Sequence, residues 1–410
     1  MFFAKKETKK DLSPETGIFS SAVACYLFPF IVFGGYLFYC ILAKLMPHAQ
    51  GYYLIHYLYT YDHGYISRGL VGEIISWFSD TVSDDLTRWV MTGFSALLMV
   101  GMSLCIGKAL SKVRFDKEKL SIVLFVAIMI FMIPMPYKFY YMDIKLDKLV
   151  WALTLISVSI ADTKYGKWVV PFICMIATVV NPIFVFTSMI LIAIILLQEF
   201  YANGFSAKNG IVCGITYISI IALALLAPIS EKWVGFETPA EMVDFYFARY
   251  TGSMEDVMYE QFADMWLIDF FLPIDEIFRT SFAMYFGDFA MGLKSALNAV
   301  LLCAPVCAFT GIFWRKVIKA EENKFQKFIY FLCAISPVVI IPPVLLSWEL
   351  SKLFLNNVFV QAGLIIYFVV KGQPAVVKTC NEIKEFGKKH LIASVSVILY
   401  FLCYLAQILN

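Results

Sequence analysis

Long apolar stretches separated by short polar loops recur along almost the whole of this 410-residue sequence. A helix of about 20 apolar residues is long enough to cross the hydrocarbon core of a bilayer. Charged residues make up only 16% of the chain, which is too few to cover the surface of a soluble protein of this length. We therefore expect an all-α fold, a polytopic bundle of transmembrane helices in an integral membrane protein.

The apolar stretches predict about 11 spans. In residue numbers these are 20–46, 88–108, 119–136, 147–162, 167–180, 183–198, 210–229, 292–314, 328–347, 354–370 and 391–409. Between 167 and 198 the apolar run is interrupted by Asn181-Pro182. Because proline removes a backbone donor and clashes with the preceding turn, this stretch is either two short helices or one long kinked helix. We divide the chain into an N-terminal membrane module, 1–200, and a C-terminal membrane module, 201–410.

Lys and Arg are concentrated in alternate loops, while Asp and Glu predominate in the loops between them. Cytoplasmic loops of membrane proteins carry an excess of Lys and Arg, so this alternation predicts a cytoplasmic N-terminus. The large loops 47–87 and 230–291 and the short loops 137–146 and 348–353 then lie on the exterior face. A net charge of only +2 points to no polyanionic partner, and we expect no nucleic-acid binding.

The first exterior loop, 47–87, contains a short amphipathic segment. Its apolar residues recur on one helical face, which predicts a helix that lies in the membrane interface beside the bundle. The residues on this face are Leu70, Val71, Ile74, Ile75 and Phe78.

Asp62 lies at the centre of the same loop, next to His63 and before Arg68. A carboxylate near the membrane surface is costly unless it is paired or used. Asp62 is therefore either a catalytic base, with Arg68 binding a phosphate through its two-pronged guanidinium, or the partner of Arg68 in a structural ion pair. A metal at Asp62, His56 and His63 is conceivable, but the histidine spacing fits interfacial aromatic roles better.

The second exterior loop, 137–146, leads into an apolar span through Asp143 and Asp147. These two acids are four residues apart, so they would share one face of a helix that begins before Asp143. They are either an acidic pair that holds a metal or orients a lipid phosphate, or helix-capping residues. Asp147 fits the capping role well, whereas Asp143 fits it less well.

The large exterior loop, 230–291, combines many acids with interleaved aromatic residues. Carboxylates accept hydrogen bonds from sugar hydroxyls, and aromatic faces pack against sugar C–H groups. The loop is therefore either a sugar-binding surface or a solvated acidic cap over the bundle. Arg249 and Arg279 are rare positive charges here that could meet a lipid pyrophosphate. Lys352, in the late exterior turn, is either a phosphate contact or an interface anchor.

The placement of these acids resembles the GT-C superfamily of integral membrane glycosyltransferases. The resemblance rests on Asp62, just before an interfacial helix, and on the second acidic segment, MDIKLDKLVWALTLIS. The segment VVPFICMIATVVNPIFVFTSMILIAIIL is similar to the next region of that superfamily, where a turn with a proline interrupts the bundle. The resemblance covers 20–200 and consists of placement with few fixed letters. This chain has Asp-His where many members have Asp-Glu, and it lacks their large soluble C-terminal domain.

The resemblance implies an inverting sugar transfer from a polyprenyl-phosphate-linked donor on the exterior face of the membrane. Asp62 is then the catalytic base that deprotonates the acceptor hydroxyl, and Asp143 is the second catalytic candidate, near the donor phosphate or a metal. The candidate substrate-binding residues are His63, Tyr65, Arg68, Arg249, Arg279 and Lys352.

The same resemblance implies three partners: the polyprenyl-phosphate sugar donor, a glycan or glycolipid acceptor, and membrane lipid. No cofactor is required with certainty, and a divalent metal stays open. The implied setting is polysaccharide biosynthesis for the cell envelope at a bacterial cytoplasmic (inner) membrane.

Two other functions stay open. An O-antigen or capsule polysaccharide polymerase has similar spans and a large exterior loop, but it favours paired exterior arginines, and only Arg68, Arg88, Arg249 and Arg279 are available. A non-enzymatic lipid-linked sugar transporter or flippase predicts ionisable residues in mid-span and repeat symmetry. The sequence offers only Lys44, near the end of a span.

Overall fold

The computed structural model describes residues 22–49, 51–113, 146–204, 206–230, 234–252, 307–340 and 350–392, with 276, 279–280, 283, 395–396 and 399. Within these residues every regular element is a helix, and the one β-type contact is an isolated bridge between Val82 and Tyr250. The expected all-α fold is therefore confirmed for this part of the chain. It follows from the apolar runs, whose backbone groups can be satisfied inside a bilayer only by helices or closed barrels.

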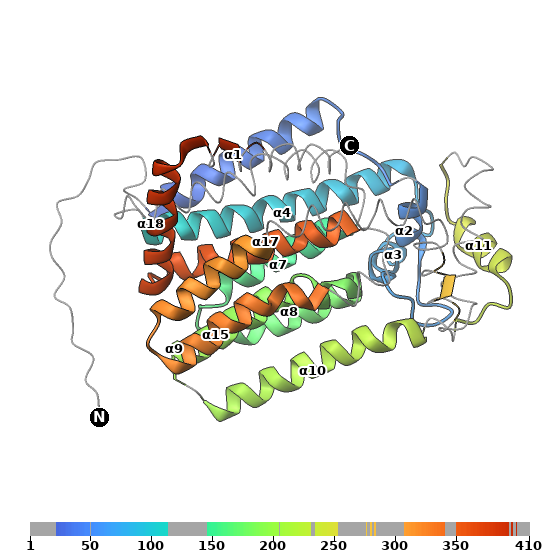
Figure 1. The fold of residues 1–410 in the computed structure, drawn as a ribbon. Coiled ribbons are helices and arrows are strands. Elements are labelled where there is room, and N and C mark those ends of the chain that lie inside the picture. Colours follow the sequence, from blue (N-terminus) through green and yellow to red (C-terminus); the bar gives the residue numbers. More distant parts are fainter. Residues whose placement is uncertain are drawn as a thin grey trace.

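The long helices form a bundle (Figure 1). They are α1 (Ala22–Leu42), α4 (Asp84–Val113), α7 (Asp147–Ile160), α8 (Gly166–Val180), α9 (Met189–Ala202), α10 (Ala207–Ser230), α15 (Lys324–Ile335) and α17 (Leu350–Val370). A further helix covers 307–320. The shorter elements are η1 (Gly51–Leu54), α2 (Ile55–Leu58), α3 (Leu70–Ser76), η4 (Pro182–Phe186), α11 (Pro239–Phe247), η7 (Ser336–Ile340) and α18 (Pro374–Lys389).

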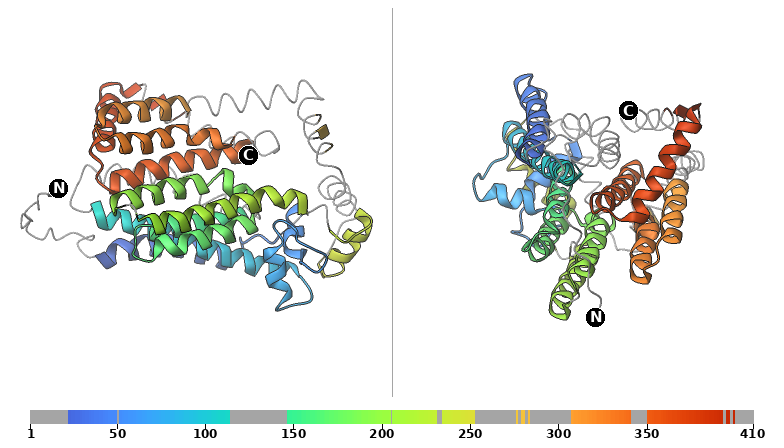
Figure 2. Two further views of the ribbon diagram at one scale, coloured as in Figure 1. Left: turned by 90° about the horizontal axis from the view of Figure 1, so that it is seen from below. Right: turned by 90° about the vertical axis from the view of Figure 1, so that its left-hand side faces the viewer.

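Helix α4 holds the N-terminal half of the bundle together, because it packs against both α1 and α7. Helix α9 contacts α7, α15 and α17, and α17 also contacts α4, so the two halves share one core. Seen end-on in Figure 2, the N-terminal helices, blue to green, lie on one side of the bundle and the C-terminal helices, orange to red, on the other.

Two of the described helices are long and apolar enough to cross a membrane, Val23–Leu42 and Asp84–Lys112. A third span is formed if 356–370 and 374–389 count as one element, although they meet at a bend of 112°. Three more apolar helices, in α8, α9 and α10, are shorter. The count of about 11 spans stays a prediction, since the span expected at 119–136 and most of the span expected at 391–409 fall outside the described residues.

Several helices present large apolar side chains on their outer faces. On α1 they include Val23, Ile31 and Phe38, and on α10 they include Ile211 and Ile218, each more than half exposed. A soluble protein rarely leaves such continuous apolar surface in water. These faces suit contact with lipid acyl chains, as expected for a membrane bundle.

The Asn181-Pro182 interruption divides the long apolar stretch into two helices, which decides between the two predicted alternatives. Helix α8 ends at Val180, the five residues of η4 follow, and α9 begins at Met189. The side-chain oxygen of Asn181 accepts a hydrogen bond from the backbone N–H of Ile183, which caps η4. Pro182 then occupies the first position of η4, where no backbone donor is needed.

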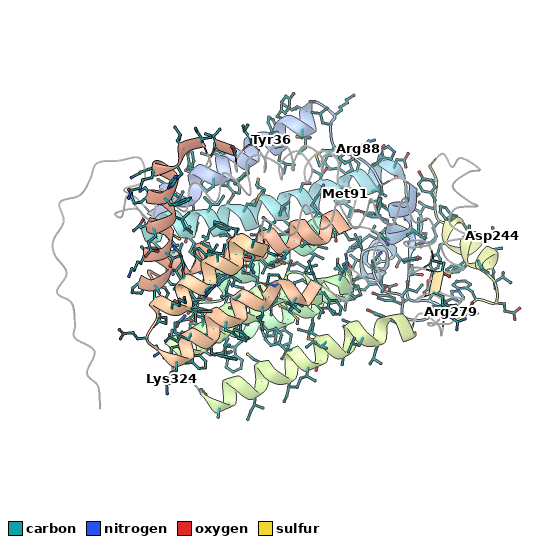
Figure 3. The ribbon with its side chains drawn as sticks, in the orientation of Figure 1. Tyr36, Arg88, Met91, Asp244, Arg279 and Lys324 are labelled. Atoms are coloured by element: carbon teal, nitrogen blue, oxygen red, sulfur yellow. The ribbon has the colours of Figure 1, made fainter. Side chains whose placement is uncertain are left out.

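Loops predicted to lie on the same side of the membrane meet at the same end of the bundle. At one end, residues 60 and 82 bond to residues 246 and 249. At the other, Lys108 and Lys371 pair with Asp162. Figure 3 places Lys324 at the end opposite Asp244 and Arg279. The partition of loops into two sets is thus present in the fold, while the orientation of the bundle in a membrane stays a prediction.

Candidate functional site

The first predicted exterior loop folds tightly on itself because a glycine allows two backbones to touch. A Cβ added to Gly72 of α3 would lie 2.2 Å from the carbonyl oxygen of Tyr59. Glu73 of α3 then ties the preceding loop in place: one carboxylate oxygen accepts the backbone N–H of Tyr61 at 2.9 Å, and the other accepts the indole N–H of Trp77 at 3.0 Å. This packing positions the segment that carries Asp62.

The amphipathic helix predicted from the apolar pattern is present but short, and its place in a membrane interface stays a prediction. It runs over Leu70–Ser76 and buries Val71 and Ile75 against the core. Ile74 and Phe78, which were expected on the same face, are 40% and 85% exposed. Phe78 lies beyond the last helical residue, so the helical register that would have placed it with Val71 has already ended.

Residues 234–252 close over this loop from a distant part of the chain. The backbone N–H of Val82 donates to the carbonyl of Arg249 at 2.7 Å, and Thr251 returns a bond to the carbonyl of Val82 at 3.0 Å. The hydroxyl of Tyr246 donates to the carbonyl of Thr60 at 3.2 Å. The two predicted exterior loops therefore form one structural unit at this end of the bundle.

The carboxylate of Asp62 is exposed at the surface of this unit. The hydroxyl of Thr60 donates to Asp62 Oδ2 at 2.7 Å, which fixes the direction of the side chain. Burial, together with the negative charge of Asp62, raises the pKa of the Tyr246 hydroxyl above its ordinary value. Asp62 is thus oriented, open to a ligand and close enough to Tyr246 to influence it electrostatically.

Arg249 is a cation that the fold brings into electrostatic reach of Asp62. Its Nη1 donates to the carbonyl of Leu58 at 2.6 Å, and its Nε donates to the carbonyl of Asp80 at 3.4 Å. Its Nη2 is enclosed and has no acceptor among the described residues. Burial lowers the pKa of Arg249 from its ordinary value, and the charges of Asp62 and Glu73 oppose that change. The guanidinium remains a cation at neutral pH with one donor nitrogen uncommitted within the described part.

His63 has an aromatic role in this structure. Its ring lies 4.4 Å from the ring of Phe236 and 4.5 Å from that of Phe245, measured between centroids. Its carbonyl accepts the backbone N–H of Gly235 at 3.0 Å. Among the described residues no three His, Cys, Asp or Glu side chains are grouped as metal ligands would be, which includes the set of Asp62, His56 and His63.

The other predicted binding residues of the first loop lie close by in the chain but have different surroundings. The ring of Tyr65 stacks on that of Tyr61 with centroids 5.6 Å apart. Arg68 is half-buried, and its backbone adopts a left-handed conformation with φ of 65°. Arg279 is exposed and lies at the same end of the molecule as Asp244 (Figure 3). Lys352 belongs to the first turn of α17, and its side chain lies outside the described part.

Of the predicted acidic pair, Asp143 falls outside the described residues. Asp147 is the first residue of α7, and its side chain is directed across the bundle: Oδ1 accepts from the Asn181 side-chain amide at 2.8 Å. Asp147 is only 5% exposed, so it links α7 to the break between α8 and α9. The prediction that Asp147 caps a helix did not include its hydrogen bond with Asn181, because Asn181 is remote in sequence.

Lys148 is a buried charge that the sequence did not single out. It is fully buried at the start of α7, and its ammonium group donates to the Ser95 hydroxyl of α4 at 3.2 Å.

Thr60 and Tyr246 were also missed as neighbours of Asp62. The only signal available for Thr60 was its position two residues before Asp62, where a hydroxyl can reach a carboxylate.

Comparison with known proteins gives one match. The pattern of the family described as uncharacterised membrane protein Rv1490 matches residues 26–270. This range contains all but the first four residues of α1 and the elements from η1 to α11, and therefore both loops that build the unit around Asp62. No curated protein and no solved structure matches the chain.

Proposed function

This chain belongs to the family described as uncharacterised membrane protein Rv1490, and we propose, from the residues around Asp62, that it is a membrane glycosyltransferase. The donor in this proposal is a sugar linked to a polyprenyl phosphate, and the acceptor is a hydroxyl of a glycan or glycolipid. The reaction takes place at the exterior face of a bacterial cytoplasmic membrane. The observation that carries the proposal is the placement of an exposed, oriented carboxylate, Asp62, within electrostatic reach of a half-buried arginine, Arg249, at the predicted exterior end.

The reaction needs a base and a cation in different places. In the proposed step the acceptor oxygen attacks the anomeric carbon of the donor, while the acceptor proton passes to Asp62. The bond between the anomeric carbon and the phosphate oxygen breaks, and the phosphate leaves with that electron pair. A guanidinium stabilises the developing charge, because its N–H groups match two phosphate oxygens.

Arg249 suits the phosphate-binding role better than Arg68. Two of its nitrogens are held by backbone carbonyls, so the guanidinium is pre-organised, and the enclosed Nη2, which has no acceptor among the described residues, is the donor that a ligand oxygen would have to reach. Tyr61, Tyr65 and the rings around His63 supply aromatic surface of the kind that packs against sugar C–H groups. The exposed Trp77 and Phe78 next to α3 suit the membrane interface, where a lipid-linked donor would arrive.

Conversion of Asp62 to asparagine tests the proposal. The Asp62→Asn variant keeps the shape of the side chain but removes its basicity, so transfer should fall by about 10²- to 10⁴-fold per folded molecule. The assay is sugar transfer by the purified full chain with a panel of polyprenyl-phosphate-linked sugars. Asp244→Asn is the matched control, because Asp244 is an exposed acid of α11. Equal turnover in both variants, or no transfer from any donor by the wild type, would end the proposal.

A second candidate function, the lipid-linked sugar transporter, is favoured by one observation. Lys148 and Asp147 are buried at the start of α7, and ionisable residues inside membrane bundles often mark a substrate pathway. A transporter would require these two residues for movement of the lipid across a bilayer. It would tolerate Asp62→Asn, so the same variant separates the two functions.

A further inference from the structure

A cluster of ion pairs closes the predicted cytoplasmic end of the bundle. Asp162, in the turn between α7 and α8, pairs with Lys108, with Lys112 at 2.7 Å and with Lys371 at 3.3 Å. Lys371 also pairs with Glu199 of α9 at 2.5 Å. Three ammonium groups therefore face two carboxylates, which leaves one formal positive charge in excess.

The carboxylate of Asp162 is held in its charged form. Burial of its side chain acts against ionisation, but hydrogen bonds from Lys108 and Lys112 outweigh burial and lower the pKa of Asp162 well below 3.8. Lys112 is the most accessible of the three cations, with 38% of its side chain exposed. An additional anion would meet Lys112 first.

A cavity of about 90 Å³ lies directly inside this cluster. Its polar end is formed by Lys108, Lys112, Asp162 and Lys371. The remainder is mainly apolar and is walled by α4, α7 and α17, including Ile106, Ala109, Leu155, Val158, Phe359 and Ile366. From Lys112 to Cys105 the lining of α4 spans seven residues, which at 1.5 Å per residue is a depth of about 10 Å.

A ligand that fills this cavity needs an anionic group at one end and an apolar group at the other. An inorganic phosphate would satisfy the ammonium groups but leave the apolar walls unfilled, and a neutral alkane would do the reverse. Basic pockets between helices on the cytoplasmic side of membrane proteins bind anionic lipid head groups. The cavity is smaller than the roughly 150 Å³ space that holds a benzene ring, so its volume limits an acyl chain to a short segment inside it.

We propose that this cavity is a binding site for an anionic phospholipid of the cytoplasmic leaflet. The lipid phosphate lies against Lys112 and its neighbours, and the first part of one acyl chain enters between α4, α7 and α17. The site is at the opposite end of the bundle from Asp62 and does not depend on the proposed transfer reaction.

The experiment measures lipid retention by the full chain after delipidation in detergent. Native mass spectrometry compares binding of phosphatidylglycerol with that of phosphatidylcholine of equal chain length. The wild type should prefer phosphatidylglycerol. Lys112→Gln should reduce that preference by about fivefold, the effect of one lysine near a lipid surface. Lys316→Gln is the matched control, because Lys316 is a half-exposed, acid-paired lysine that does not line the cavity.

A second pair of variants tests the apolar part of the site. Val158→Phe fills the cavity from α7 and should reduce retention of both lipids, whereas Leu153→Phe, on the same helix but outside the lining, should not. If Val158→Phe fails to fold, the Lys112→Gln result decides alone, since Lys112 is accessible. Equal retention of the two lipids by the wild type would overturn the proposal. So would displacement of bound lipid by inorganic phosphate alone, which would indicate a site for free phosphate.

Discussion

Replacing Gly72 by alanine tests how the exterior loop is built. The new Cβ would lie 2.2 Å from the carbonyl oxygen of Tyr59 and 3.0 Å from the carbonyl group of Tyr57. An ordinary contact between such atoms is roughly 3.5 Å, so α3 must move by about 1 Å. Both neighbours are backbone atoms, and no change of rotamer can relieve the contact. The ring of Tyr59 packs on Tyr246 at 5.2 Å, so the shift would also disturb the contact with α11.

The expected loss of stability follows from two opposing terms. Overpacking of this kind costs about 1–3 kcal/mol, with the upper end expected for contacts that cannot yield. Alanine returns about 1 kcal/mol through its better helix propensity. The Gly72→Ala variant should therefore be about 2 kcal/mol less stable than the wild type.

Thermal unfolding of the full chain in detergent measures this effect. Gly93→Ala on α4 is the matched control, because a Cβ at Gly93 would meet no atom within 4 Å. That variant should unfold at the same temperature as the wild type or at a slightly higher one. If Gly72→Ala unfolds at or above the temperature of Gly93→Ala, the close approach of α3 to residues 57–59 is wrong.

Three further predictions concern orientation, donor binding and pH. In a Cys-free background, a cysteine at Glu322 should be shielded from an impermeant thiol reagent in intact cells and one at Glu237 should be labelled; the reverse pattern would invert the topology. Arg249→Lys should weaken binding of a polyprenyl-phosphate sugar by about tenfold or more, as expected for loss of charged hydrogen bonds, and Arg68→Lys should have a smaller effect. A larger effect of Arg68→Lys would indicate that Arg68 binds the phosphate. Asp162→Asn should lower the unfolding temperature at pH 7. Because the folded-state pKa of Asp162 is depressed, its full contribution is present above the unfolded pKa near 3.8. The contribution is lost progressively as the pH falls from there through the folded pKa, so the stability difference between the two proteins should shrink in acid. A difference that is independent of pH would contradict the ion-pair cluster.

The sequence predicted the parts of the fold that depend on local pattern. Apolar runs gave the positions of α1, α4 and α10, and Asn181-Pro182 gave the break between α8 and α9. Alternating loop charge gave the two sets of loops that meet at opposite ends of the bundle. Each of these signals is contained in a short window of residues, where the bilayer length or proline geometry acts directly.

The partners of the candidate site could not be predicted in the same way. Arg68 was placed with Asp62 because the two are near in sequence, whereas Arg249, a candidate from a distant loop, could not be placed beside Asp62 although the structure brings it within electrostatic reach. Arg249 reaches this position because the backbone of residues 249–251 pairs with Val82 and because Tyr246 bonds to Thr60. Asp147 likewise bonds to Asn181, 34 residues away. Contacts of this range depend on how helices pack, which no local pattern encodes.

The bond from Arg249 to the carbonyl of Leu58 also has a consequence for how the protein is made. The two residues are 191 positions apart. At a synthesis rate of about 5–20 residues per second, the loop that carries Asp62 emerges roughly 10 to 40 s before its arginine. During that interval α2 and α3 lack the contacts with residues 234–252 that hold the first loop in place. A ribosome-bound chain arrested before residue 249 should therefore have an inserted first loop that proteases cut, and release of the complete chain should protect it.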